Sequence, residues 1–209
     1  NMTRKLTAAK GTLVNVMTEQ IALALSNIRL QEKLRYQADR DPLTGLFNRR
    51  SMDKVIAREI RHAAGRASPL CLAILDLDHF KRFNDTFGHQ AGDALLHQIG
   101  TLLKGRVRDR DIVCRYGGEE FTILFPDTPF LDALHRLKDL QKEIRELHVP
   151  HNGQILESVS VSVGVAILPE HGHTPESLIA AADAALYRAK TEGRNRIVVA
   201  TGLKAPAGG

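Results

Sequence analysis

The chain has 209 residues, 43% hydrophobic side chains and a formal net charge of +5, which allows one well-buried domain and a smaller appendage. The absence of tryptophan and the low aromatic content of 5% argue against a stacking platform for single-stranded nucleic acid. The net positive charge favours polyanionic partners, although a solvated basic surface without a partner would give the same charge. No apolar run approaches the roughly 18 residues of a membrane span, and no signal-peptide core is present. We therefore expect a soluble, cytoplasmic domain, to which an upstream segment could still add a membrane anchor.

The first 40 residues predict one long helix, at about 6–36. Its apolar residues step by three and four along one seam, at Val14, Met17, Ile21, Ala24 and Ile28. Such a seam favours a coiled coil with a second helix, because an unpaired apolar stripe needs burial. Beyond it the apolar line shifts to Leu30 and Leu34, as at a stutter. A single amphipathic helix packed on its own domain is the alternative.

From residue 40 onward the sequence alternates between helix and strand patterns. Helices are predicted at 48–64, 79–86, 91–105, 130–147 and 175–190, and strands at 70–77, 112–116, 121–125, 159–168 and 196–199. The strand at 70–77 is continuously apolar, which is typical of a strand covered on both faces. These patterns predict an α/β or α+β sandwich, with helices flanking a mixed central sheet. We expect the tail at 202–209 to be disordered.

The two cysteines, Cys71 and Cys114, lie in apolar runs and have no Cys or His at ligand spacing. This pattern favours small buried side chains in a reducing compartment over a disulfide or a zinc site.

Acidic residues follow the buried strand and also occupy the predicted hairpin turn. Asp76 and Asp78 come at the end of the strand, and Glu119 and Glu120 follow Gly117-Gly118. An unpaired buried carboxylate is strongly disfavoured, and a divalent cation suits several oxygens that converge at one point. If the two strands are neighbours, Asp76 and the turn acids can share a metal. The glycines would leave room for a ligand or permit a positive φ in the turn.

The segment RYGGEEF at 115–121 resembles the signature of the GGDEF family of diguanylate cyclases, with Glu119 as an accepted variant in the third position. Further blocks of that family occur in the same order, at 41–50 (DPLTGLFNRR), 76–85 (DLDHFKRFND), 88–89 (GH), 92–93 (GD), 162–165 (SVGV), 187–190 (YRAK) and 193–195 (GRN). Phe47 departs from the family, in which proline is common at this position. The resemblance covers about residues 40–200, and it implies a nucleotidyl-cyclase-like palm preceded by a sensor-linker helix at 1–39 and followed by a tail at 201–209.

By this resemblance, a divalent metal, Mg²⁺ or Mn²⁺, would be held by Asp76, the carbonyl of Leu77, Glu119 and, at a second position, Glu120. Glu119 would also accept the proton of the attacking 3′-hydroxyl, and geometry must decide between this role and a ligand role alone. Lys81 would stabilise the transition state. Asp78 is more simply explained as a helix cap or an anchor of the fold.

The resemblance also implies a set of substrate contacts. Asn84 and Asp93 match the guanine-recognising pair, and a carboxylate suits guanine because guanine presents N–H donors. His89 matches another substrate contact, although a capping or packing histidine is nearly as good an explanation. The phosphates would be contacted by the remaining residues of the set, which are His79, Phe80, Gly117, Gly118, Lys190 and Arg194.

Arg108 and Asp111 occupy the positions of the family's RxxD inhibitory site, at which Arg and Asp would bind the product cyclic di-GMP. Without the family context, a solvated charged turn would be the simpler interpretation. A supporting basic residue would come from the next helix, which offers Arg136, Lys138 and Lys142.

The implied function is condensation of two GTP molecules into cyclic di-GMP with release of two pyrophosphates. Because each domain binds one GTP, activity would require a homodimer, which the N-terminal helix would form. Residues 18–27 resemble the closing helix of a GAF sensor domain, so an upstream sensor is also expected. A degenerate domain that only binds GTP or cyclic di-GMP is one alternative; a nucleic-acid-binding module is another, but continuous basic helices and exposed aromatics are not evident.

Overall fold

The computed structural model describes residues 2–202, which form two compact units. The first is the helix α1 (Met2–Asp39), so the predicted helix is confirmed and continues to Asp39. Met17, Ile21 and Ile28 of the predicted seam are exposed within this unit, whereas the side chain of Val14 is not among those described. The predicted disordered tail lies outside the described residues from position 203 onward.

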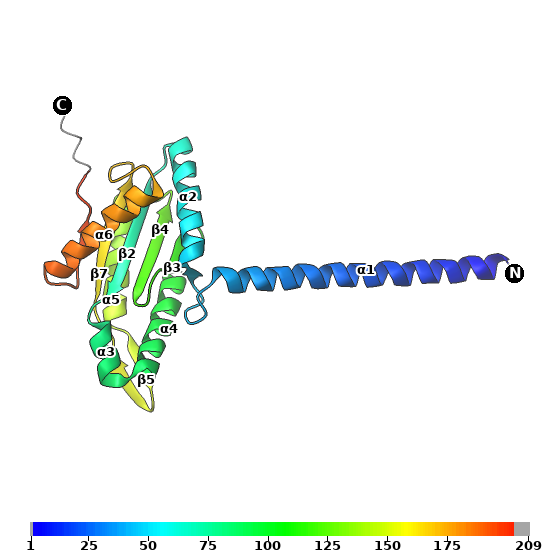
Figure 1. Cartoon of the computed structure of the whole chain (residues 1–209), viewed down its shortest axis with the longest axis horizontal. Coiled ribbons are helices and arrows are strands. Elements are labelled where there is room, and N and C mark those ends of the chain that lie inside the picture. The colour runs from blue at the N-terminus through cyan, green and yellow to red at the C-terminus, as the bar shows by residue number, and fades with distance from the viewer. Residues whose placement is uncertain (1, 203–209) are drawn as a thin grey trace. The chain divides into compact units, whose positions relative to one another are not determined.

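The second unit begins at Arg40 and contains the remaining elements (Figure 1). In chain order these are β1 (Phe47–Asn48), α2 (Arg49–Arg66), β2 (Leu70–Leu77), α3 (Phe80–Phe87), α4 (His89–Arg106), β3 (Ile112–Arg115), β4 (Glu120–Pro126), α5 (Phe130–Arg145), β5 (His148–His151), β6 (Gln154–Glu157), β7 (Val161–Leu168), α6 (Pro175–Thr191) and β8 (Ile197–Val199). Within residues 40–202 they form a six-stranded sheet of order β1-β3-β4-β2-β7-β8 and a separate β5-β6 hairpin.

The large sheet is mixed, which confirms the predicted fold class. β2 pairs antiparallel with β4 on one side and with β7 on the other, whereas β1–β3 and β7–β8 are parallel pairs. β2 therefore lies inside the sheet, between β4 and β7, and its C-terminal end lies next to the β3–β4 turn.

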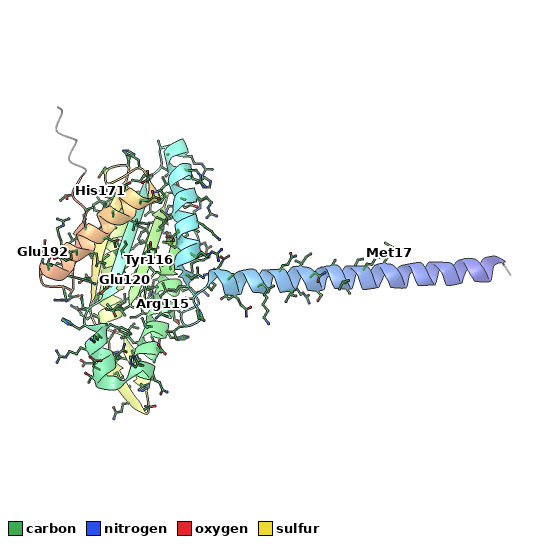
Figure 2. The ribbon with its side chains drawn as sticks, viewed as in Figure 1. Met17, Arg115, Tyr116, Glu120, His171 and Glu192 are labelled. Carbon is green, nitrogen blue, oxygen red and sulfur yellow. The ribbon has the colours of Figure 1, made fainter. Side chains whose placement is uncertain are left out.

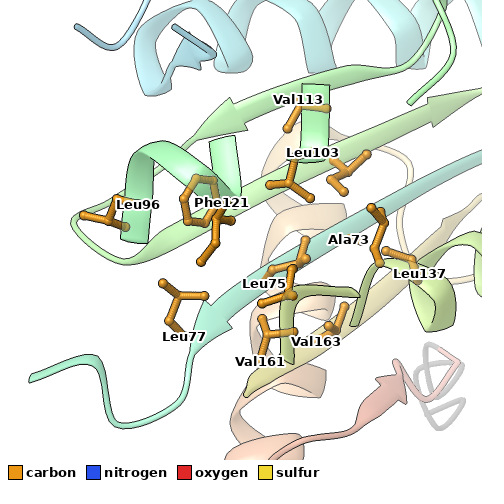
Figure 3. Packing of buried hydrophobic residues seen from close by; sticks show 14 of the residues in the cluster. Ala73, Leu75, Leu77, Leu96, Leu103, Val113, Phe121, Leu137, Val161 and Val163 are labelled. Atoms are coloured by element: carbon orange, nitrogen blue, oxygen red, sulfur yellow. The ribbon is translucent and has the colours of Figure 1, made fainter. Parts of the chain in front are cut away.

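Successive side chains of β2 point to opposite faces of the sheet, and each face has its own hydrophobic core. Leu70, Leu72 and Ile74 pack with α2 and α6 on one face, and both helices lie over that face in Figure 1. The intervening residues, among them Ala73 and Leu75, pack with α3, α4 and α5 on the other face (Figure 3). Burial on both faces explains why the sequence of β2 is apolar without interruption.

Local signals set the ends of the flanking helices. Asn48 caps α2, and its side-chain oxygen accepts a hydrogen bond from the Ser51 amide at 3.1 Å. Thr174 and Ser177 form a capping box at the start of α6, with a proline at its first position. α3 and α4 are separated by Gly88, whose φ of 87° favours glycine.

Three strands, β1, β5 and β6, were not predicted from the sequence. β1 has only two residues and gives no periodic pattern. The β5-β6 hairpin turns at Asn152-Gly153, both with positive φ, and this dipeptide is a strong hairpin signal that the sequence analysis overlooked. Cys71 and Cys114 are both buried and free, as predicted. None of the described helices combines the length and apolar character that crossing a membrane requires.

Candidate functional site

The acids of the strand end and of the hairpin lie on adjacent strands. Asp76 of β2 is directly opposite Glu120 of β4, so both side chains point to the same face of the sheet. The Leu77 amide donates a hydrogen bond to the Glu119 carbonyl at 3.3 Å, which extends the pairing into the turn. The structure therefore brings together the two acidic segments that the sequence places more than one helix apart.

The two glycines of the turn do not have a positive φ, so the second of the two explanations offered for them is wrong, and only Gly117 is explained by space. Neither Gly117 nor Gly118 has a positive φ. A Cβ atom on Gly117 would lie 2.4 Å from a carboxylate oxygen of Glu120, whereas one on Gly118 would meet nothing within 4 Å. Gly117 thus makes room for the Glu120 carboxylate, and Gly118 leaves the turn open.

The charges at this end of the sheet are incompletely balanced. Burial raises the pKa of Asp76; the Lys190 ammonium, 2.7 Å from Oδ2, opposes that rise, and the neighbouring carboxylate of Glu120 adds to it. Burial also raises the pKa of Glu119, with the Asp76 carboxylate adding to the rise and Lys190 opposing it. One ammonium does not fully compensate this acidic group, so a further cation would be attracted to it.

The donor set suits a hard divalent cation. Asp76, Glu119, Glu120 and the Leu77 carbonyl offer only oxygen ligands, which Mg²⁺ and Mn²⁺ prefer. Among the side chains that the structure describes, no three His, Cys, Asp or Glu residues are arranged so that they alone would hold an ion. Mg²⁺ usually takes one or two carboxylates and completes its shell with water and phosphate oxygens. The residues therefore fit a metal that binds together with a nucleotide.

Asp78 has a different role. Its side chain is almost fully buried and accepts hydrogen bonds from the hydroxyls of Ser160 and Ser162, both at 2.7 Å, and from the Asn195 amide at 3.0 Å. His79 occupies the N-cap position of α3 without a side-chain cap. Asp78 thus anchors β2 to β7 and to the turn after α6, so the anchoring alternative is confirmed and the capping alternative is wrong.

A cleft of about 550 Å³ opens between α3, α4 and the hairpin turn. Most of the sequence-predicted nucleotide contacts line it, together with three residues that the sequence analysis did not single out, Asp85, Leu96 and Arg115. The predicted residues that line the cleft are Phe80, Lys81, Asn84, His89, Asp93, Gly118 and Glu119. Backbone, cationic, amide and carboxylate groups therefore meet in one cavity, a combination that suits a nucleotide.

Comparisons with known proteins agree with this arrangement. A profile described as the GGDEF domain of diguanylate cyclases matches residues 38–196. The chain belongs to the GGDEF family.

Curated relatives include the response regulator PleD of Caulobacter vibrioides, 39% identical over 160 residues, and the diguanylate cyclase DgcP of Pseudomonas aeruginosa, 40% identical over 169 residues. These alignments cover 76% and 81% of this chain but only 35% and 25% of the relatives. Among solved structures, the coiled coil and GGDEF domain of DgcB from Caulobacter crescentus in complex with c-di-GMP superposes with a TM-score of 0.82 at 31% identity. That likeness covers 90% of this chain and 99% of the other.

Four residues assigned to the substrate by family resemblance do not line the cleft. Gly117 lies next to the Glu120 carboxylate, and Lys190 pairs with Asp76. His79 and Arg194 have left-handed backbones with φ near 60° and belong to the turns before α3 and after α6. The cleft is lined by Asn84 and Asp93, which the sequence analysis assigned to the base, whereas Lys190 of α6 pairs with Asp76.

Arg115 connects the hairpin to the first motif of the family. Its guanidinium donates to the Gly118 carbonyl at 2.8 Å and to both carboxylate oxygens of Asp41 at 3.3 Å. The side chains of Arg115 and Glu120 lie near the hairpin turn (Figure 2). Although burial raises the pKa of Asp41, hydrogen bonds from Thr44 and the charge of Arg115 bring it below its usual value.

The RxxD segment forms a compact turn in the GGDEF domain. The buried Asp111 carboxylate accepts a hydrogen bond from the Arg108 amide at 2.7 Å and a second from the Arg136 guanidinium of α5. Arg136 also stacks over the Phe125 ring, with 5.0 Å between guanidinium carbon and ring centroid. Of the three basic residues that the sequence offered, Arg136 is therefore the one that contacts Asp111. The exposed Arg108 side chain borders a cleft of about 440 Å³ with Arg40 and Lys104.

Proposed function

We propose that this GGDEF domain condenses two GTP molecules into cyclic di-GMP and releases two pyrophosphates. The observation that carries this proposal is the position of Asp76 opposite Glu120, beside a cleft that contains Glu119, Lys81 and the Asn84–Asp93 pair. The chain spans 35% and 25% of the length of the two curated relatives named above, so the activity of the whole protein is part of the proposal.

In this mechanism Asn84 and Asp93 bind the guanine base, because the Asp93 carboxylate accepts from the N–H donors that adenine lacks. The Lys81 ammonium faces the phosphates and neutralises charge as it develops on them. Asp76, the Leu77 carbonyl, Glu119 and Glu120 would hold the metal. Mg²⁺ or Mn²⁺, when bound, supplies polarisation of the α-phosphate and charge neutralisation on the leaving group.

Glu119 takes the proton of the attacking hydroxyl. The 3′-oxygen of one GTP forms a bond to the α-phosphorus of the other, the bond from that phosphorus to the β-phosphate oxygen breaks, and pyrophosphate leaves. The position of Glu119 on the cleft that would hold GTP supports this role as proton acceptor. A second, symmetric attack closes the ring.

Each domain contributes one GTP, so two domains must face each other. We assign this dimerisation to α1, whose exposed apolar residues at Met17, Ile21 and Ile28 follow a coiled-coil seam. The solved DgcB fragment, which is described as a coiled coil with a GGDEF domain, supports this assignment. An upstream sensor would act by changing how the two helices pair. Nucleic acid is not expected as a partner.

We also propose that cyclic di-GMP inhibits the enzyme at Arg108 and Asp111. The Arg136–Asp111 contact fixes the aspartate, and the exposed Arg108 guanidinium is left to bind a phosphate or a guanine edge. Arg108→Ala should abolish inhibition by added cyclic di-GMP, whereas the neighbouring Arg110→Ala should be inhibited like the native protein. Inhibition of Arg108→Ala at the same cyclic di-GMP concentration as the native protein would refute this site.

The activity is tested by incubating the protein with GTP and Mg²⁺ and measuring pyrophosphate and cyclic di-GMP. We expect two pyrophosphates per cyclic di-GMP, a loss of at least about 1,000-fold in Glu119→Gln, and no change in the exposed control Glu157→Gln. GTP binding without product in the native dimer would instead favour the alternative in which the domain is only a nucleotide receptor.

A further inference from the structure

Gly92, in the first turn of α4, lies against the side chain of Asn84 on α3. A Cβ atom placed on Gly92 would be 1.8 Å from Asn84 Oδ1, 2.9 Å from its Cγ and 3.1 Å from Cζ of Phe80. The first two of these separations are shorter than any side chain accommodates without displacement. Gly92 has an ordinary helical backbone, and glycine there costs about 1 kcal/mol relative to alanine. Its presence is therefore explained by space for Asn84 and not by backbone freedom.

The Asn84 carboxamide oxygen itself lacks a partner. Within residues 2–202 it is a buried acceptor without a hydrogen bond, although Asn84 lines the nucleotide cleft together with Asp93. Leaving a buried acceptor unpaired is costly, so such a group indicates a donor that arrives with a ligand. Guanine supplies that donor, because its N1 and its 2-amino group both carry hydrogens on one edge.

We propose that Gly92 is a positioning residue for guanine recognition, because its missing side chain lets Asn84 hold its acceptor at the base. The inference rests on the proposed function in one respect, namely that GTP occupies this cleft. Gly92 and Asp93 are adjacent on α4, so one turn of helix would set both acceptors that read the base. A methyl group at position 92 displaces the Asn84 carboxamide and leaves the guanine donor unpaired.

Three glycines on α4 allow a matched test. Gly92→Ala adds a methyl group against Asn84, Gly100→Ala adds one 2.7 Å from Cβ of Thr44, away from the cleft, and Gly105→Ala adds one into open space. In the native dimer we expect Gly92→Ala to lower kcat/KM for GTP at least about tenfold, mainly through KM, because one hydrogen bond to the base is lost. Gly100→Ala should lower Tm but keep KM, and Gly105→Ala should leave KM unchanged without lowering Tm.

A double-mutant cycle separates positioning from general destabilisation. Once Asn84→Ala has removed the carboxamide, adding Gly92→Ala should cost less than about twofold in GTP affinity measured by calorimetry. A full tenfold loss in that background, or native affinity in the single variant, would overturn the proposal. Because binding is measured directly, the outcome is separable from a failure of the cyclase activity, which would appear as native GTP binding without product.

Discussion

Asp76 and Asp78, at the end of β2, are both buried but have different surroundings. Around Asp78, the hydroxyls of Ser160 and Ser162 supply fixed donors, and the side chain is held as a structural anchor. Around Asp76, one ammonium from Lys190 faces a group of acids, and burial raises the aspartate pKa. Burial alone therefore does not separate the proposed metal ligand Asp76 from the structural anchor Asp78. The distinguishing property is a buried carboxylate that the protein leaves short of donors and surrounds with like charges.

The largest effect is expected for Asp76→Asn. Product formation should fall at least about 1,000-fold, because a metal ligand is lost. The metal-free protein should become more stable: the raised pKa means that ionised Asp76 costs stability above that pKa, and the neutral amide removes this cost. We therefore expect the Tm of the metal-free variant at pH 7 to lie above that of the native chain.

Exposed Asp139, exchanged for Asn, is the control and should change neither activity nor Tm. A lower Tm in Asp76→Asn would show that the Lys190 pair stabilises the fold, and the contrast between the two aspartates would then be lost.

Asp78→Ala should give the opposite result. It removes the acceptor for two hydroxyls and one amide, so the free energy of unfolding should fall by about 3 kcal/mol. Calorimetry should show a Tm lower by about 6–12 °C. Ser160→Ala, which removes one of the donors, should cost about 1 kcal/mol. A stable but inactive Asp78→Ala protein would instead place this residue in the metal site.

The last expected effect is graded with conditions and is the pH dependence of metal binding. Asp76 and Glu119 must be ionised to bind Mg²⁺, and both have raised pKa values. As pH falls through these values protons compete, so the Mg²⁺ affinity should weaken by about tenfold per pH unit for each proton displaced. Lys190→Met should move this loss to higher pH, because the ammonium that opposes the rise is gone. Calorimetric titration of the protein with Mg²⁺ in the presence of an unreactive GTP analogue, from pH 8 to pH 5, measures the loss of Mg²⁺ affinity in the native chain and its shift in Lys190→Met.

The sequence predicted most of the helices and strands, since hydrophobic periodicity and capping residues are local properties. β2 was predicted over its full length because a strand buried on both faces needs an unbroken apolar run. The boundary between α3 and α4 was less sharp, and the Asn152-Gly153 hairpin was overlooked despite its turn signal. The ordered motifs along the sequence were enough to indicate a GGDEF domain, and the cleft gathers Asn84, Asp93 and Glu119 accordingly.

By itself the sequence determined the kinds of side chain available and the elements that carry them. Only the tertiary structure decided that Asp78 is an anchor, that Arg136 rather than another basic residue contacts Asp111, and that Gly92 makes room for Asn84. Periodicity records which face of an element is apolar. It does not record which donor from a distant strand or helix reaches a given carboxylate, because that depends on how the layers pack and on the register of the sheet.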